Sequence, residues 1–255
     1  MRRALLALLL VLLPLPASAR EEVVLGLSQS EVAITATFDG SRILIFGAVK
    51  REAPIPEGPP LQVVVTVAGP SMPLTVWRKS RRFGIWVNTD SVRVDAAPSF
   101  YAVATSGPFD KVLTHVEDLR HHVSIERAVR ATGATADVAD APDFVDAVIR
   151  IRREAGLYKI VENAAVVDQQ TLFRTAIDMP SNVTEGKYRT RIFLTRAGRV
   201  VSLYETEIDV RKVGLERWLY NLSRQNPPVY GLMSIAIAIA AGWGASAAFR
   251  VLRRG

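Results

Sequence analysis

An uncharged run of 21 residues near the C-terminus, 229–249, constrains the fold of this chain more than any other feature. It is rich in alanine, isoleucine and glycine, and about 20 apolar residues at 1.5 Å of rise each are enough for a helix to cross a bilayer. Two prolines precede the run, and three arginines follow it in the tail 250–255. Because cationic residues stay on the cytoplasmic side, the run predicts a single transmembrane helix with a cytoplasmic C-terminus.

The first 19 residues have the three parts of a secretory signal peptide. The basic start "MRR" precedes an apolar run at 4–13 and an A-x-A cleavage site at 17–19. We therefore expect cleavage after Ala19 and export of the chain that follows. Together with the orientation of the C-terminal helix, this predicts a single-pass protein of a bacterial inner membrane, with most of its chain in the periplasm.

The charge of the exported part is close to balanced. The whole chain has 32 Lys and Arg against 25 Asp and Glu, a formal net charge of +7. Five of the cations lie in the predicted signal peptide and tail, so the remainder carries a net charge of about +2 and does not indicate a nucleic-acid partner. The chain has no cysteine, which excludes thiol chemistry, disulfide exchange and cysteine–zinc sites.

The region 20–107 is predicted to be an Ig-like β-sandwich. Its segments are rich in Val, Ile and Thr and are separated by turn-forming sequences such as "DG" at 39–40. Short strands at this spacing are typical of sandwiches. Strands are expected at 22–28, 31–38, 42–50 and 61–69.

The apolar period changes to that of helices in a predicted insert, 108–156. A first helix is expected at 109–130. Its residues at helical spacing are Val112, Val116, Leu119 and Val123. A second helix is expected at 143–156, with Gly156 as its C-cap.

A second β-module is predicted at 157–213. Its clearest element is a hairpin with the two-residue turn "AG" at 197–198, which predicts that Ile192 lies opposite Leu203. An amphipathic juxtamembrane segment, 214–228, follows. The predicted fold class is thus mainly β: Ig-like β-sandwich modules with a short helical insert, and then a single C-terminal transmembrane helix.

The densest cluster of cations lies in "WRKSRRFGIWVN" at 77–88 and is expected at the turn of a β-hairpin. The cations are Arg78, Lys79, Arg81 and Arg82. Such a cluster is either a solvated hairpin tip or a contact for an anionic ligand, a lipid headgroup or an acidic partner, because the arginine fork matches carboxylate and phosphate oxygens. Trp77 and Trp86 beside it are predicted to be packing residues.

Two histidines and an aspartate on the first predicted helix could hold a divalent metal ion: His115, Asp118 and His122. Their spacing spans two turns, wider than the pair four residues apart that brackets one ion, so an ordinary polar helix face is the alternative. Nucleophile-elbow, Walker A, dinucleotide-binding, H-E-x-x-H and EF-hand motifs are absent. The sequence therefore predicts a protein without catalytic residues or a cofactor.

Small residues in the predicted transmembrane helix stand four positions apart, as helix–helix packing motifs do. They are Ala241, Gly242, Ala245 and Ser246. This spacing lets a second helix approach closely, although alanine and glycine are also common in helices that serve only as tethers.

Three sequence blocks and the C-terminal span resemble a family of putative transmembrane proteins of alphaproteobacteria. The blocks are "GP" at 69–70, "WRKSRRFGIWVN" at 77–88 and "PSFYAVATS" at 98–106. The resemblance covers nearly the whole exported chain. It implies a bacterial envelope protein, brings no catalytic residues, and implies a transport-related role beside a sulfite-exporter-type permease.

Two functions are consistent with these observations. In the first, the protein is a non-enzymatic, membrane-anchored interaction or accessory protein for an integral inner-membrane partner. In the second, it is a periplasmic binding module for a small anion or a divalent metal, at the basic hairpin or at the histidine face.

Overall fold

The computed structural model describes residues 21–28, 31–34, 40–52, 54–131, 141–212 and 215–252. The predicted signal peptide and the last three residues of the predicted tail lie outside these ranges. Most of the described chain between 21 and 212 is β-strand, which confirms the predicted mainly β class.

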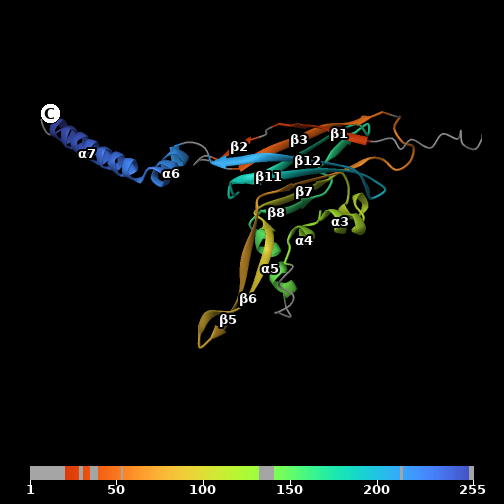
Figure 1. Cartoon of the computed structure of the whole chain (residues 1–255), viewed down its shortest axis with the longest axis horizontal. Helices are drawn as coiled ribbons and strands as arrows, with labels where there is room; N and C mark the ends of the chain where they lie inside the picture. The colour runs from red at the N-terminus through yellow and green to blue at the C-terminus, as the bar shows by residue number, and fades with distance from the viewer. Residues whose placement is uncertain are drawn as a thin grey trace, which may run out of the picture.

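Two sheets form the body of the protein. Sheet A has four strands in the order β1 (Glu21–Leu27), β3 (Gly40–Arg51), β10 (Leu172–Pro180) and β9 (Val166–Asp168). Sheet B has six strands in the order β2 (Glu31–Ile34), β12 (Arg199–Lys212), β11 (Gly186–Arg196), β4 (Gln62–Ala68), β7 (Tyr101–Thr105) and β8 (Tyr158–Val161). Figure 1 shows the two sheets stacked as layers.

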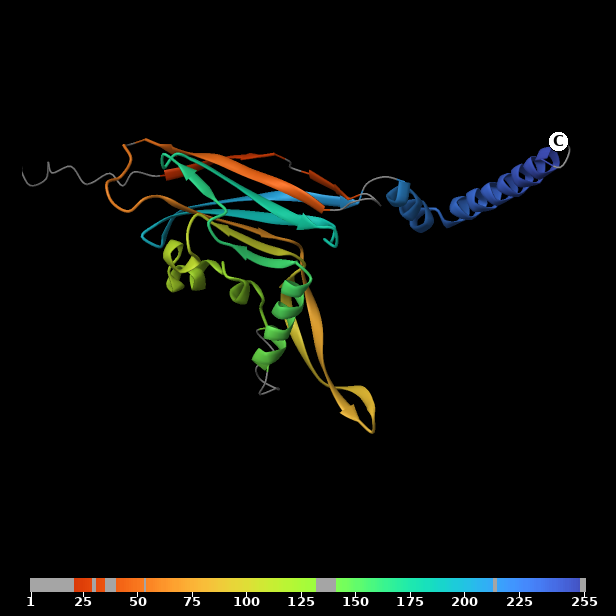
Figure 2. The same ribbon diagram turned by 180° about the vertical axis from the view of Figure 1, so that it is seen from behind.

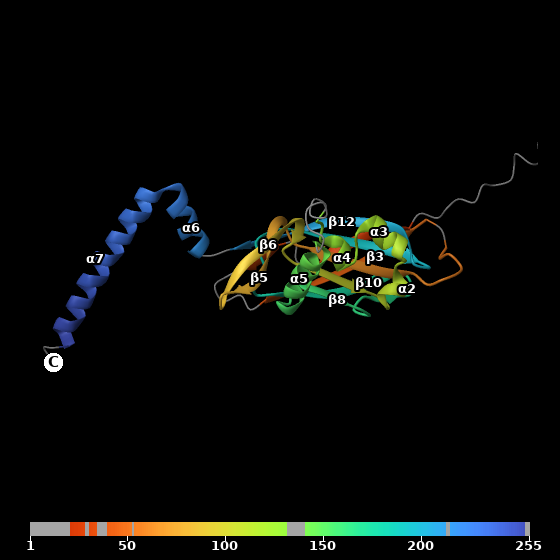
Figure 3. The ribbon, with the colours of Figure 1, turned by 90° about the horizontal axis from the view of Figure 1, so that it is seen from below.

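The core lies between the two sheets, where alternate residues of each strand face inward. Sheet A contributes the buried side chains of Val23, Ile43, Ile45, Phe173 and Ile177. Sheet B contributes those of Val63, Val65, Ile192 and Leu194. The central strands of sheet B are buried on both faces, because short helices cover the face that points away from sheet A (Figure 3).

Strands from the two β-rich regions of the sequence, 20–107 and 157–213, are interleaved in both sheets. β10 pairs with β3 over its whole length, and β11 pairs with β4 from Arg189 opposite Ala68 to Thr195 opposite Gln62. The predicted division into an N-terminal sandwich and a second β-module is therefore not how the strands are arranged. The two regions share one core.

The helical insert contains four helices in its described part: α2 (Phe109–Val112), α3 (His115–His121), α4 (Ile125–Ala128) and α5 (Ala141–Glu154). The prediction of α5 is confirmed, and Gly156 has the left-handed backbone of a C-cap, φ +72°. The prediction of one helix at 109–130 is wrong. Thr114 caps a new helix by accepting a hydrogen bond from the Glu117 amide, and His122 ends that helix in the left-handed region.

The β11–β12 hairpin has the predicted turn but a different register. Ala197 and Gly198 both have positive φ angles, as a two-residue hairpin turn requires. A bulge between Leu194 and Thr195 shifts the pairing, so that Ile192 lies opposite Tyr204 rather than Leu203.

The C-terminus is helical. α6 (Leu215–Gln225) covers most of the predicted juxtamembrane segment, and α7 (Pro227–Leu252) contains the apolar run. Within the described residues, α7 is the one helix long and apolar enough to span a membrane, over Pro227–Ser246. Its described side chains are mostly exposed, as expected for a helix that lies in lipid.

Candidate functional site

A long hairpin projects from the sandwich and carries the cation cluster. β5 (Ser71–Arg82) and β6 (Ile85–Pro98) pair only with each other, and we call this hairpin, 71–98, the β5–β6 arm. At about 3.3 Å per residue, its 12-residue strand β5 is about 40 Å long. Figures 1 and 2 show the arm extending well away from both sheets. A pair of strands alone is barely stable in water, so the arm needs support at its base.

Helix α5 supplies that support. Val92 of β6 is buried with Ala141 and Phe144 of α5, and Val76 packs against them. Arg78 also belongs to this base, because its guanidinium lies over the Phe144 ring at 4.7 Å from the centroid and is 4.0 Å from the Asp143 carboxylate. The remainder of the hairpin, 79–88, lies beyond α5 in Figure 2, and we call it the arm tip.

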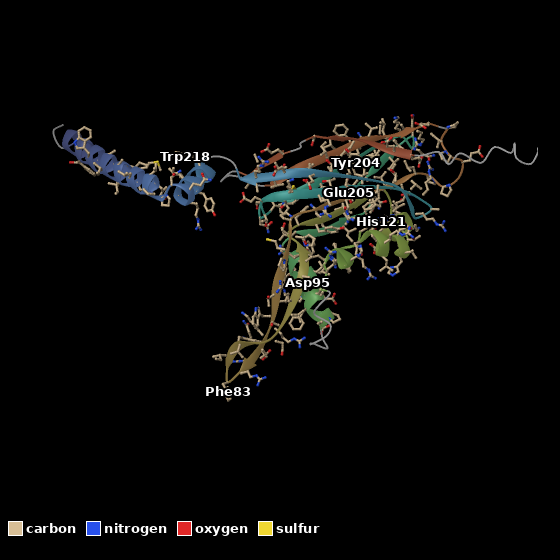
Figure 4. All side chains as sticks on the ribbon, in the orientation of Figure 1. Phe83, Asp95, His121, Tyr204, Glu205 and Trp218 are labelled. Atoms are coloured by element: carbon tan, nitrogen blue, oxygen red, sulfur yellow. The ribbon has the colours of Figure 1, made fainter. Side chains whose placement is uncertain are left out.

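The arm tip ends in a two-residue turn made by Phe83 and Gly84. Their φ angles are +50° and +85°, which suit the type of turn that joins adjacent strands. Figure 4 shows Phe83 at the far end of the arm, and its side chain is fully exposed. The predicted cations Arg78, Lys79, Arg81 and Arg82 lie on β5 and lead up to the turn, so the turn itself begins later in the sequence than expected.

Phe83 is an unexpected residue at this place. Asn, Asp or Gly is favoured in such a turn, and a bulky residue with a positive φ costs about 1–2 kcal/mol. Burial offsets none of that cost, since Phe83 is fully exposed. The strained, outward-facing Phe83 therefore marks the turn as a candidate contact site.

Three other apolar side chains at or next to the arm tip are also exposed. Trp86 is 68% exposed, Trp77 is 55% exposed, and Ile85 is exposed beside the turn. The prediction that both tryptophans are packing residues is wrong. In the strand register, Arg81 lies opposite Trp86 and Arg82 lies opposite Ile85, so both faces of the arm tip combine an apolar group with a cation. The sequence 77–88 contains no acidic residue to neutralise them.

The predicted metal residues do not converge on one point. Asp118 is buried, and its Oδ1 accepts hydrogen bonds from the amides of Val123 and Ser124 at 3.0 and 2.7 Å. His122 is the exposed C-cap of α3. Within the described ranges, no group of three His, Asp or Glu side chains is arranged to hold a metal ion. The carboxylate of Asp118 therefore serves to close the α3–α4 connection.

The small residues of α7 contact no other segment among the residues that the structure describes. Ala241, Gly242, Ala245 and Ser246 are all exposed, and a Cβ atom added at Gly242 would meet nothing within 4 Å. This surface of the helix is open to a second helix.

One buried ion cluster was not found by reasoning from the sequence. The Glu21 carboxylate lies 2.7 Å from the Arg51 Nε and 2.8 Å from the Arg196 Nη2. The three side chains, which we call the Glu21 cluster, are exposed by only 4%, 7% and 13%, respectively. Burial alone would raise the pKa of Glu21, but hydrogen bonds and charges from Arg196 and Arg51 outweigh it and hold the pKa below 4.5.

The comparison with known proteins gives a family and no characterised relative. The profile of a family described as "Putative transmembrane protein (Alph_Pro_TM)" matches residues 22–251, which include every strand from β2 on, the β5–β6 arm and nearly all of α7. No curated protein matches the chain.

Proposed function

The chain belongs to this family of transmembrane proteins, and from that premise we propose that it is a non-enzymatic accessory protein whose β5–β6 arm binds an integral membrane protein. We further propose that the signal peptide is removed, that the sandwich and the arm lie in the periplasm, and that the tail after α7 is cytoplasmic. The exposed aromatic and cationic arm tip is the observation that carries this proposal.

The composition of the arm tip favours a protein surface as its target. Tryptophan and arginine are the residues most enriched among those that dominate binding energy at protein interfaces. Arg81 and Arg82 lie on opposite faces of the hairpin, so they fit a cleft with acidic groups on two sides. The open small-residue face of α7 gives the same partner a second place to bind, within the membrane.

The topology is tested with alkaline phosphatase, which is active only in the periplasm. We expect a fusion after Arg224 to be active and a fusion after Arg254 to be inactive, because the apolar run between them is long enough to cross the bilayer. Equal total amounts of the two fusions on an immunoblot serve as the control. Activity only at the second position contradicts the proposed orientation.

The partner is tested by photo-crosslinking in the membranes of the native host, with benzoylphenylalanine in place of Phe83. This residue keeps an aromatic ring at the apex of the arm. We expect it to capture one integral membrane protein, the same one in independent preparations. Benzoylphenylalanine in place of the exposed Tyr204, which Figure 4 shows on the sandwich, is the positional control and is expected to capture nothing specific.

Matched variants decide whether the captured protein binds the arm tip. The double change Arg81→Gln and Arg82→Gln is expected to lower the yield of the adduct about tenfold or more, as the loss of a dominant contact does. The double change Arg174→Gln and Arg199→Gln, which removes two exposed cations from the sandwich, is expected to leave the yield unchanged. Adducts with lipid alone, or an adduct equally abundant in both variants, contradict the proposal. The Gly242→Leu variant then reports whether α7 touches the same protein.

A further inference from the structure

A cavity rich in cations lies where the β5–β6 arm joins the sandwich. It has a volume of about 360 Å³ and lies on the face of sheet B that carries the short helices. One wall is formed by the β4–β5 connection and the ends of the arm, including Pro70 and Pro98, and another by α4 and the residues that follow it. We call it the basic cavity. It is separate from the arm tip.

Five cations line the basic cavity, and they come from two parts of the chain. They are Arg127, Arg130, Lys187, Arg189 and Arg191. The last three alternate along β11, and alternate residues of a strand point to the same face of its sheet. Arg127 lies in the last turn of α4, and Arg130 is held close by a backbone bridge to Ala96 of the arm. The tertiary structure therefore brings together charges that lie about 60 residues apart in the sequence.

The acidic residues nearest to the β11 cations are on β12, where Glu207 lies opposite Arg189 and Asp209 lies opposite Lys187 in the register. Glu207 is the one carboxylate among the residues that line the cavity, and it pairs with Lys187 at 3.0 Å. Glu205 lies opposite Arg191 in the register of β12 but does not line the cavity. In the part of the chain that the structure describes, no acidic side chain pairs with Arg127, Arg130 or Arg189. Like charges gathered in one cavity repel one another, and a bound anion would remove that cost.

Arg191 contributes a positive charge to the cavity, and hydrogen bonds fix the position of its guanidinium. Its guanidinium donates to the backbone oxygens of His121 at 2.6 Å and His122 at 3.0 Å, and to the hydroxyls of Tyr101 at 3.2 Å and Thr66 at 3.3 Å. The Tyr101 hydroxyl itself donates to the Val123 oxygen at 2.8 Å. These bonds occupy nearly all the donors of Arg191. Arg191 therefore contributes a held charge, and Arg127, Arg130 and Arg189 remain as the donors for a ligand.

We propose that the basic cavity binds a small molecule through a tetrahedral dianion, a phosphate or a sulfate. Guanidinium forks bind such oxygens in pairs, and a tetrahedral group presents oxygens toward donors on more than one wall, whereas a carboxylate presents two oxygens in one plane. The volume of about 360 Å³ lies within the range of about 300–1,000 Å³ that is usual for small-molecule sites, so the cavity also has room for an organic body beside Pro70, Pro98 and Ala128. This inference does not depend on the proposed role of the arm tip.

Titration calorimetry on the purified full chain in detergent tests the proposal, at constant ionic strength set with chloride. The probes are inorganic phosphate, inorganic sulfate, glycerol 3-phosphate and succinate, a dianion whose charges are on two planar carboxylates. We expect saturable binding of the tetrahedral anions and at least tenfold weaker binding of succinate. Tighter binding of glycerol 3-phosphate than of phosphate identifies a phosphorylated molecule as the ligand, and equal binding identifies the free anion.

Variants show whether the anion occupies this cavity. The double change Arg127→Gln and Arg189→Gln removes one donor from α4 and one from β11 and is expected to weaken phosphate binding about tenfold or more. Arg174→Gln, which removes an exposed cation from the outer face of sheet A, is the matched control and is expected to bind as the wild type does. Melting curves of both variants establish that they are folded. No saturable binding to the wild type, equally tight binding of succinate, or equal losses in the two variants would overturn the proposal.

Discussion

A Glu21→Gln variant of the full chain is expected to lose about 3–5 kcal/mol of its free energy of unfolding, the usual cost of removing one partner from a buried ion pair. The two guanidiniums that remain, those of Arg51 and Arg196, would keep their buried charges without the carboxylate that balances them. The same cluster also joins three distant parts of the chain. Arg196 donates to the Pro59 oxygen at 2.8 Å and to the Gln170 side chain at 3.0 Å.

Urea denaturation in detergent, followed by tryptophan fluorescence, measures this loss. Glu22→Gln is the matched control, because Glu22 is the next residue of the same strand and its side chain is exposed. We expect the control to change stability by no more than about 0.5 kcal/mol, as is usual for surface positions. If the Glu21→Gln variant were as stable as the Glu22→Gln variant, the Glu21 cluster would make no net contribution to the free energy of unfolding.

The pH dependence gives this prediction a second readout. The pKa of Glu21 is held below its unfolded value of 4.5, so the folded state favours the ionised carboxylate. Its contribution is therefore complete above about pH 4.5 and is lost as the pH falls through the lower, folded pKa. The wild type should thus lose part of its advantage over Glu21→Gln below pH 4.5, and the difference should be constant between pH 6 and 8.

A chain truncated to residues 20–107 is expected not to fold. Without β10, sheet A is reduced to β1 and β3, and without β11 and β12, sheet B is reduced to β4 and β7 with β2 left unpaired. The truncation also removes Phe173, Ile192 and Leu194 from the core, and replacing even one such large side chain by alanine costs about 2–5 kcal/mol. The total loss exceeds the 5–15 kcal/mol that stabilises a typical domain.

Circular dichroism and urea titration test this expectation. The full chain should give a strand-rich spectrum and a cooperative transition, while the truncated chain should show neither. A chain in which a Gly-Ser linker replaces only the arm tip, 79–88, is the matched control and should fold, because none of the arm-tip side chains is buried. Cooperative unfolding of the 20–107 fragment would mean that the first β-rich region has a core of its own.

The local features of this chain were predictable from short stretches of sequence. The turn at 197–198 was found because glycine readily adopts the positive φ angles that such a turn needs. Helix α5 was found because its buried residues Phe144, Val148 and Ile149 repeat with the helical period. In each case the residues that decide the structure are neighbours in the sequence.

The candidate sites show where such reasoning ends. Spacing alone predicted one helix through Val116 and Leu119, yet both side chains are exposed, and Asp118 closes a turn by binding the amides of Val123 and Ser124. The composition of 77–88 drew attention to the arm tip. It could not show that Trp77 and Trp86 are exposed, because exposure depends on whether other segments of the chain pack against the arm. No local pattern indicated the basic cavity or the partners of Glu21, since Arg51 and Arg196 lie 30 and 175 residues away from it.

The sequence by itself determined the apolar helix α7, because a helix satisfies its backbone hydrogen bonds within one segment and the bilayer demands only length and apolar side chains. It also determined the mainly β class, through residues that suit a pleated, half-buried surface. Only the tertiary structure decided which strands pair, because a strand completes its hydrogen bonds with a neighbour that can lie anywhere in the chain. The interleaved sheets, the shared core and the charges gathered in the basic cavity all follow from that choice of neighbours.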